Sequence, residues 1–464
     1  MLFSLVLALV SATITYALPT IEAFGNKFFT SDGNQFFIKG VAYQLVPDDP
    51  LVDTAQCARD ASLMEKLGVN TIRVYHVDPD ADHDGCMKVF ADAGIYTMID
   101  MDTFTTYILP NDPYWNDTQF DAYKKVMDAF HSYDNLLGLF VGNEIIAVNN
   151  QSLAAPFIKS ASRDLKAYRD SKGYRKIPVG YSATDIAELR PYLQDYLTCG
   201  GDASENIDFY GINSYQWCDP STYMTSGYAN LQEEAKNFPV PIFFSETGCN
   251  VPGPRLFEDQ ASIFGPEMIK HWSGAIIYEW IEEQNHYGLI SYGPKADPTA
   301  NGKNVFDGFT RAGTPTPVSP DFDNLSKQWA KITPTGVAKS DYDPKIVSTR
   351  ACPTSTVDGW LVDGNVPGPT LGASLTNVAA STKTNTGSDT DATSVSSGND
   401  SSSDSSSGSG SDSGASTSAP ASATSGMTAV PTASETKNAV PGYREATGMS
   451  AWLVGFMMMF TFWL

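Results

Sequence analysis

The chain has 464 residues, 42% of them hydrophobic, which is enough for one large core or two domains. Its formal net charge of −23 argues against nucleic acid as a partner. None of the six cysteines belongs to a Cys-x-x-Cys pair, so the sequence predicts no zinc site.

The first residues have the pattern of a secretory signal peptide. Residues 2–11 form a short apolar run, and the segment 15–17 offers a cleavage site. We therefore expect residues 1–17 to be removed on secretion. In a secreted chain an even number of cysteines suggests three disulfides, although the count leaves their pairing open.

Next along the chain, apolar runs typical of buried strands alternate with segments of helical periodicity. Helical spacing of apolar residues is clear at 54–68 and 118–133. Eight strands alternating with helices predict an α/β fold, a (β/α)₈ TIM barrel, and nearly continuous apolar runs suit parallel strands buried on both faces. The expected strands are 36–44, 70–77, 95–102, 137–144, 176–183, 208–215, 240–247 and 275–282.

Several of the predicted strands end in a polar side chain. Glu144 ends the fourth strand and Glu246 ends the seventh. Because the active site of such a barrel lies at the C-terminal ends of its strands, these side chains predict a cleft there. The other polar residues at strand ends are Gln44, Tyr75, Asp100, Tyr215 and Tyr278.

Two carboxylic acids that face each other across a cleft are typical of enzymes that cleave glycosides. One protonates the leaving glycosidic oxygen and the other attacks the anomeric carbon, so we expect neither a metal nor another cofactor. Each residue also has a structural interpretation. Glu144 could pair with Arg73, Asn143 could satisfy backbone groups at its strand end, and the tyrosines could be core residues with hydroxyls at the rim.

The composition changes sharply after about residue 355. Sixteen of the forty residues from 391 to 430 are serine, and such a stretch cannot bury enough apolar area to fold. Residues 18–355 are therefore predicted to form the catalytic domain. Residues 356–437 are predicted to be a disordered stalk rich in Ser and Thr.

The chain closes with an apolar run at 451–464, shorter than the roughly 20 residues that span a bilayer. A polar spacer before a short apolar tail is the pattern of a GPI-attachment signal, here 438–464 with Asn438 as the attachment residue. The alternative is a tail-anchor helix. The signal peptide at the other end favours the GPI anchor.

Six motifs follow one another along the predicted barrel: GVAYQ (40–44), RVYHVDP (73–79), GNE (142–144), GINSYQWC (211–218), FSETGCN (244–250) and IIYEW (276–280). Together they resemble glycoside hydrolase family 72, the fungal β-1,3-glucanosyltransferases of the cell wall, which are often GPI-anchored. The resemblance covers about residues 20–350. It implies a β-1,3-glucan donor and acceptor, and a location on the outer leaflet of the plasma membrane and in the cell wall. We expect a monomer.

The resemblance also implies roles for individual residues. Glu144 would be the general acid/base and Glu246 the nucleophile. Asn143 would contact the sugar 2-hydroxyl, and Tyr215 would orient the nucleophile. The residues expected to line the donor and acceptor subsites are Gln44, Tyr75, Asp100 and Tyr278. The implied disulfides are Cys57–Cys86, Cys218–Cys249 and Cys199–Cys352.

Two other functions remain open. An endo-β-1,3-glucanase would use the same two glutamates, with water in place of the sugar acceptor. A non-catalytic wall protein that only binds glucan is disfavoured by the intact glutamate pair. The chain also departs from the family pattern in two places. Only one cysteine follows Cys249, too few for the second cysteine-rich module that many family members carry. Phe104 occupies a position where a proline or small residue is expected.

Overall fold

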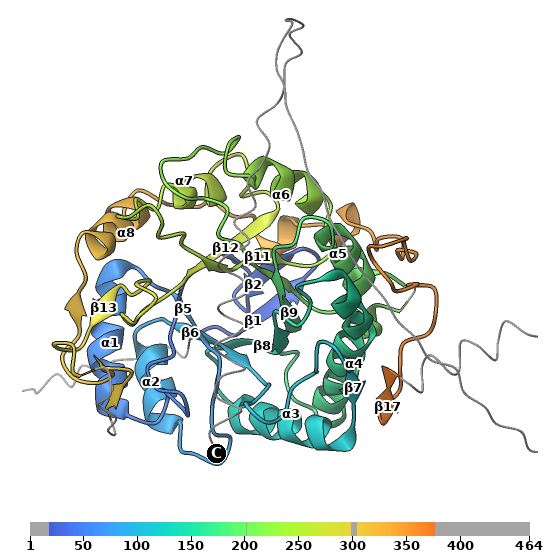
Figure 1. The fold of residues 1–464 in the computed structure, drawn as a ribbon, viewed down its shortest axis with the longest axis horizontal. Coiled ribbons are helices and arrows are strands. Elements are labelled where there is room, and N and C mark those ends of the chain that lie inside the picture. The colour runs from blue at the N-terminus through green and yellow to red at the C-terminus, as the bar shows by residue number, and fades with distance from the viewer. Residues whose placement is uncertain (1–17, 201, 298–303, 376–464) are drawn as a thin grey trace, which may run out of the picture. The chain divides into compact units, whose positions relative to one another are not determined.

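The structure, a computed structural model, describes residues 18–200, 202–297 and 304–375, and its centre is a closed barrel of eight parallel strands (Figure 1). Each strand pairs with the next barrel strand along the chain, and β12 pairs with β4 to close the circle. The predicted TIM barrel is therefore confirmed. The barrel strands are β4 (Ile38–Ala42), β5 (Thr71–Val74), β6 (Tyr96–Asp100), β8 (Leu136–Asn143), β9 (Val179–Thr184), β10 (Tyr210–Asn213), β11 (Ile242–Thr247) and β12 (Trp272–Ile277).

Each of these strands overlaps its predicted segment, because strands buried on both faces must be apolar at nearly every position. The last strand is the largest deviation. It was expected at 275–282 but ends at Ile277, because regular pairing stops there: the Glu279 N–H donates to Tyr287 O, although the N–H groups of Tyr278 and Trp280 still donate to Thr247 O and Ala42 O of the neighbouring strands.

The helices form a ring outside the barrel (Figure 1). They are α1 (Thr54–Leu67), α2 (Asp84–Asp92), α3 (Asp117–Phe130), α4 (Ala155–Ser171), α5 (Arg190–Thr198), α6 (Tyr228–Ala235), α7 (Asp259–Ile263) and α8 (Asp321–Trp329). Local signals fix their ends. The side chains of Asn116 and Gln119 form a capping box at the start of α3, and Gly68 ends α1 in the left-handed region at φ 86°.

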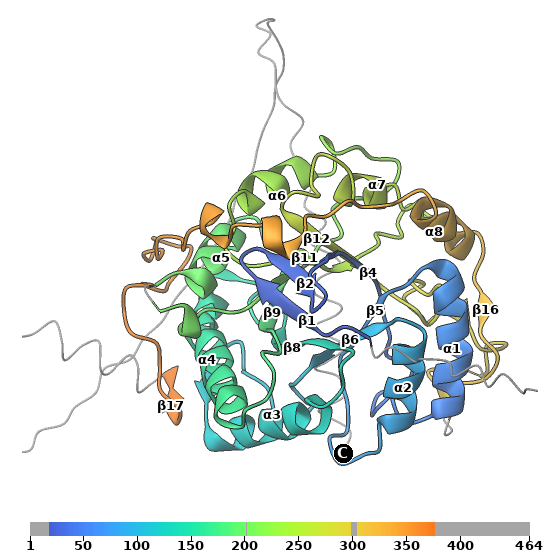
Figure 2. The same ribbon diagram turned by 180° about the vertical axis from the view of Figure 1, so that it is seen from behind.

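A small antiparallel sheet covers the N-terminal end of the barrel (Figure 2). Its strands are β1 (Ile21–Phe24), β2 (Lys27–Thr30) and β3 (Gln35–Phe36). Phe28 of β2 packs against Phe209 and Phe243, with ring centroids 6.1 Å apart in both pairs. This aromatic plug fills one end of the barrel and leaves the polar strand ends to the other.

Shorter elements lie in the connecting segments. The strands are β7 (Tyr114–Trp115), β13 (Ile290–Ser291), β14 (Val305–Phe306), β15 (Phe309–Thr310), β16 (Thr316–Pro317) and β17 (Ala373–Ser374). The 3₁₀ helices are Asn149–Ala154, Ala203–Glu205, Lys339–Asp341 and Pro344–Ile346.

The packed part of the chain continues past residue 355, which corrects the predicted end of the catalytic domain. Trp360 is fully buried, and its ring centroid lies 6.1 Å from that of Tyr192 and 5.8 Å from that of Tyr196. Strand β17 pairs with β7. Buried Trp360 and the β17–β7 pairing therefore both attach residues 356–375 to the rest of the fold.

Three predicted segments fall partly or wholly outside the described residues. These are the signal peptide, the stalk beyond residue 375 and the GPI-attachment segment with Asn438. Within the described ranges, no helix has the length and apolar character needed to cross a membrane.

All six cysteines are paired, in the three disulfides that the resemblance implies. Cys57–Cys86 joins α1 to α2. Cys218–Cys249 joins the loops that follow β10 and β11, and Cys199–Cys352 ties the end of α5 to the C-terminal segment. The Cys218–Cys249 bridge therefore restrains the loops next to Tyr215 and Glu246.

Candidate active site

Glu144 stands at a sharp bend just after β8. Its backbone has φ 51°, in the left-handed region that costs a residue with a Cβ roughly 1–2 kcal/mol. The Glu144 N–H donates to Ser182 O at 2.9 Å, which holds the bend. At Gly142 a Cβ would lie 2.5 Å from Ile145 Cδ1, so the chain needs glycine there. The bend brings the Glu144 carboxylate to Asn213, whose Nδ2 donates to Oε1 at 3.1 Å.

Glu246, on β11, is 3% exposed and has a partner on each carboxylate oxygen. The Tyr75 hydroxyl donates to Oε1 at 2.9 Å, and the Tyr215 hydroxyl donates to Oε2 at 2.7 Å. Arg73 Nη1 lies 3.5 Å from Oε1. The carboxylate is therefore fixed in orientation and stabilised in its charged form.

Arg73 is a fully buried cation beneath this pair. It binds Asp100 with two parallel hydrogen bonds, Nε to Oδ1 at 3.0 Å and Nη2 to Oδ2 at 2.8 Å. Nη2 also donates to Asn143 Oδ1 at 2.9 Å, and the guanidinium carbon lies 4.4 Å from the ring centroids of Tyr75 and Phe140. One side chain therefore connects the ends of β5, β6, β8 and β11.

The amide of Asn213 links the acid residue to the rest of the network. Its Oδ1 accepts from the hydroxyls of Ser182 and Ser245 at 3.0 and 2.8 Å, so its Nδ2 must face Asn143 and Glu144. Nδ2 donates to Asn143 Oδ1 at 3.0 Å. Because Asn143 Oδ1 already accepts from Asn213 and Arg73, the Asn143 amide nitrogen is the group left to donate to a bound molecule.

The surroundings separate the two carboxyl groups electrostatically. Burial raises the pKa of Glu144, and burial together with the charge of Glu144 raises the pKa of Glu246. The Arg73 charge and the two tyrosine hydroxyls oppose the rise at Glu246, whereas Glu144 has a hydrogen bond from Asn213 and a more distant Arg73. The pKa of Glu246 is raised to about 7, so the pair holds a proton near neutral pH. The Arg73 cation and two hydroxyl donors at Glu246, against one amide donor at Glu144, favour Glu246 as the charged member of the pair.

Aromatic side chains line the Glu246 side of the site. The Tyr278 ring lies edge-on to Tyr75 and Tyr215, with centroids 6.4 and 6.3 Å apart. Tyr287 packs on the same ring at 5.4 Å. These partly exposed rings provide apolar faces next to a fixed carboxylate, which is the surface that a pyranose ring needs for stacking.

The structure brings six of the predicted residues to this site: Glu144, Glu246, Asn143, Tyr75, Tyr215 and Tyr278. Gln44 and Asp100 instead use their polar groups within the protein. Gln44 Oε1 accepts from the N–H groups of Tyr75 and His76, and its Nε2 donates to Val46 O at 2.8 Å. Asp100 is 2% exposed and bound to Arg73. These two residues support the site from beneath.

Three residues of the site were not predicted: Arg73 as its organising cation, Asn213 and Tyr287. Spacing offered a signal for two of them. Residues two apart on a strand share a face. Arg73 could therefore have been inferred from the predicted site residue Tyr75, and Asn213 from Tyr215. Tyr287 lies in an irregular segment and gave no such signal.

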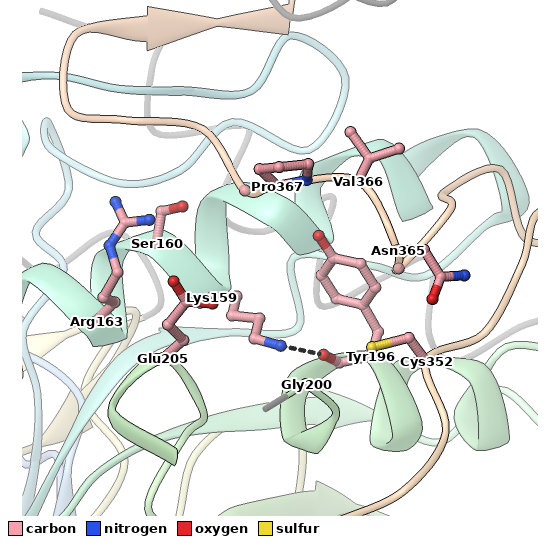
Figure 3. A pocket seen from close by; sticks show the side chains of 12 residues that line it. Lys159, Ser160, Arg163, Tyr196, Gly200, Glu205, Cys352, Asn365, Val366 and Pro367 are labelled. Carbon is pink, nitrogen blue, oxygen red and sulfur yellow. Dashed lines mark hydrogen bonds between the residues drawn. The ribbon is translucent and has the colours of Figure 1, made fainter. Parts of the chain in front are cut away.

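A cavity of about 300 Å³ lies elsewhere, between α4 and the C-terminal segment (Figure 3). Lys159 lines it, but its amine donates to Tyr196 O at 3.0 Å and Cys199 O at 2.8 Å, the carbonyls at the end of α5. The cation therefore caps a helix. Among the described residues, no group of three or more His, Cys, Asp or Glu side chains is arranged to hold a metal ion.

Asp102, just beyond β6, has a strongly perturbed carboxyl group. Its Oδ1 is buried and has no hydrogen-bond partner in the described part of the chain. Burial, together with the charge of Asp100, raises the pKa of Asp102 to about 8. A carboxyl group in such a place is held neutral near pH 7.

Comparison with known proteins places this geometry in a family. The glucanosyltransferase model of glycoside hydrolase family 72 matches residues 10–309. The chain is 41% identical over 358 residues to Protein EPD1 of Candida maltosa, a match that covers 75% of this chain and 61% of EPD1. It is 39% identical over 370 residues to the 1,3-beta-glucanosyltransferase GAS2 of Saccharomyces cerevisiae, covering 75% of this chain and 63% of GAS2. The matched part therefore spans less than two thirds of either relative.

Solved structures give the same result. A mutant of Saccharomyces cerevisiae Gas2p in complex with laminaritetraose and laminaripentaose matches with a TM-score of 0.68 at 39% identity. That match covers 76% of this chain and 75% of that chain. Gas2p in complex with laminaritriose and laminaritetraose also matches with a TM-score of 0.68 at 39% identity, over 76% of this chain and 77% of that chain.

The raised pKa of Asp102 predicts a pH-dependent stability. An unfolded aspartate titrates near pH 3.9, so between about pH 4 and pH 8 the unfolded chain releases a proton that the folded chain retains. Stability therefore falls as the pH rises through this window. Asp102→Asn removes that loss, and its Tm should exceed the wild-type Tm at about pH 7.5 and approach it at about pH 4. The exposed Asp112→Asn serves as the control, and equal Tm values for Asp102→Asn and wild type at pH 7.5 would contradict the prediction.

Proposed function

Since this chain belongs to the glucanosyltransferase family, glycoside hydrolase family 72, we propose that it is a retaining β-1,3-glucanosyltransferase. It cleaves an internal bond of one β-1,3-glucan chain and joins the fragment to another chain. The observation that carries the proposal is the asymmetric carboxyl pair. Glu246 is held between two tyrosine hydroxyls and the Arg73 cation, whereas the buried Glu144 has the neutral amide of Asn213 as its donor.

The first step breaks the glycosidic bond. The Glu246 carboxylate attacks the anomeric carbon as Glu144 protonates the departing glycosidic oxygen, and the product is a glycosyl ester on Glu246. In the second step the Glu144 carboxylate removes the proton from an acceptor 3-hydroxyl, and that oxygen attacks the anomeric carbon and releases Glu246. Two inversions at the anomeric carbon retain its configuration.

Neighbouring groups support the charge changes in these steps. The Asn143 amide nitrogen donates to the sugar 2-hydroxyl, a contact that strengthens in the transition state. Support for this role comes from the two donors that already occupy Asn143 Oδ1. Arg73 stays buried and charged throughout, so it holds Asn143 and Glu246 in place without touching the sugar.

The fate of the glycosyl ester distinguishes transfer from hydrolysis. Water is abundant, so a sugar acceptor competes with it only when the protein positions the acceptor hydroxyl, which can raise the effective concentration by several orders of magnitude. The rings of Tyr278 and Tyr287 beside Glu246 supply a surface for that positioning. An endo-β-1,3-glucanase would leave the same ester to water.

Product sizes test the proposal directly. The enzyme is incubated with a long laminari-oligosaccharide whose reducing end has been reduced, and the products are sized over time. Products longer than the donor, joined by β-1,3 bonds, are expected. If the products are all shorter than the donor at millimolar acceptor, the activity is hydrolysis. Glu144→Gln should lower turnover by about 10²- to 10⁴-fold and Glu246→Gln should abolish it, whereas the surface variant Glu233→Gln should match wild type.

Tyr215→Phe should move the pH profile in a defined direction. The Tyr215 hydroxyl stabilises charged Glu246 and so lowers its pKa, and loss of the hydroxyl raises that pKa. Because the reaction needs ionised Glu246, the acid limb of the kcat/KM profile should shift to higher pH. Tyr287→Phe is the matched control, since no hydrogen bond joins its hydroxyl to Glu246 in the described structure. An unshifted acid limb in Tyr215→Phe would remove this role.

We also propose that the chain is secreted and held at the outer face of the plasma membrane by a GPI lipid on Asn438. Support comes from the apolar run at 2–11, the polar spacer and the apolar run at 451–464. Deletion of 451–464 should release active enzyme into the culture medium. Protein that still sediments with membranes after this deletion would rule out the anchor.

A further inference from the structure

Phe104 is a large aromatic side chain that stays 52% exposed, in the segment between β6 and β7. The turn that carries it is well defined. The Thr103 N–H donates to Thr106 O at 3.0 Å, and the Thr106 N–H donates to Thr103 O at 3.2 Å. Phe104 therefore stands at the tip of a closed two-residue turn, which presents its ring in a fixed place.

The ring of Phe104 lies flat against the imidazole of His76. The two centroids are 4.2 Å apart and the planes are 18° from parallel. His76 is itself fixed, because its Nδ1–H donates to Asp48 O at 2.6 Å and its backbone N–H donates to Gln44 Oε1 at 3.1 Å. Two different loops of the same barrel end thus hold the stacked pair from both sides.

The pair is also tied to the reacting groups. His76 directly follows Tyr75, whose hydroxyl binds Glu246, and Gln44 Oε1 accepts from the backbone N–H of both residues. The Tyr75 side chain reaches Glu246, whereas the next residue carries the Phe104 contact. The stacked pair is therefore linked to Glu246 through Tyr75, the residue next to His76.

We propose that the Phe104–His76 pair is a stacking platform for an outer glucose residue of the β-1,3-glucan, and that it sets the chain length the enzyme prefers. The proposal rests on the proposed function. An isolated exposed apolar residue is common and needs no explanation. Phe104 differs in being held in a closed turn, stacked on a second fixed ring and linked through one residue to the nucleophile's partner.

The test is Phe104→Ala and Phe104→Trp, assayed on laminari-oligosaccharides of increasing length. In the donor arm the donor length varies at a fixed short acceptor, and in the acceptor arm the acceptor length varies at a fixed donor. Loss of a stacking contact should raise KM roughly three- to tenfold, in one arm, for oligosaccharides long enough to reach the platform. The KM for shorter oligosaccharides and the kcat for all lengths should be unaffected. Phe104→Trp, which keeps an aromatic ring, should have a KM as low as that of the wild type. The arm that responds identifies the donor or the acceptor chain as the ligand.

The exposed Met224→Ala, on the loop after β10, controls for the removal of an apolar side chain from the same barrel end. If KM in Phe104→Ala equals wild type at every length, or rises equally for all lengths, the platform is overturned. A wild type that neither transfers nor hydrolyses β-1,3-glucan would instead overturn the proposed function. Thermal melting of each variant separates these outcomes from misfolding.

Discussion

The buried charge of Arg73 is the constraint to which the rest of the site conforms. A guanidinium out of reach of water must be paired and hydrogen-bonded, because an uncompensated buried charge costs several kcal/mol. Asp100, Asn143 and Glu246 satisfy it from three other strands. The ends of the strands that carry these groups must therefore lie at the same level along the barrel axis. This alignment also determines the positions of Glu144 and Asn213. Lysine would not serve, because it lacks the planar fork that binds Asp100 at two points.

The Arg73 cation also makes the surroundings of the carboxyl groups in the site unequal. Asp100 and Glu246 lie within ion-pair distance of it, whereas the side-chain donor at Glu144 is the neutral amide of Asn213. Two carboxyl groups of one residue type therefore differ in function through their neighbours. The aromatic rings on the other side of Glu246 keep the surroundings apolar, which strengthens each of these electrostatic effects.

The sequence predicted the parts of this structure that follow from periodicity and position. Strands such as β8 and β11 are apolar along their length, so their places and the polar residues at their ends were readable. Partners were not. That Gln44 and Asp100 face inward depends on which groups from other strands are within hydrogen-bond distance. The bend at Glu144 and the attachment of residues 356–375 through Trp360 likewise depend on tertiary contacts that a polar or strand-like local sequence conceals.

The Cys199–Cys352 bridge has a mechanical consequence. Tension applied to the chain at its last described residues would first peel β17 from β7 and then lift Trp360 from α5, because these contacts load one after another. At Cys352 the detachment stops, because the disulfide to Cys199 is covalent. The force is then transmitted to the end of α5, in the outer ring of helices. The pulling force would therefore enter the molecule through the end of a surface helix and not through the β17 or Trp360 contacts.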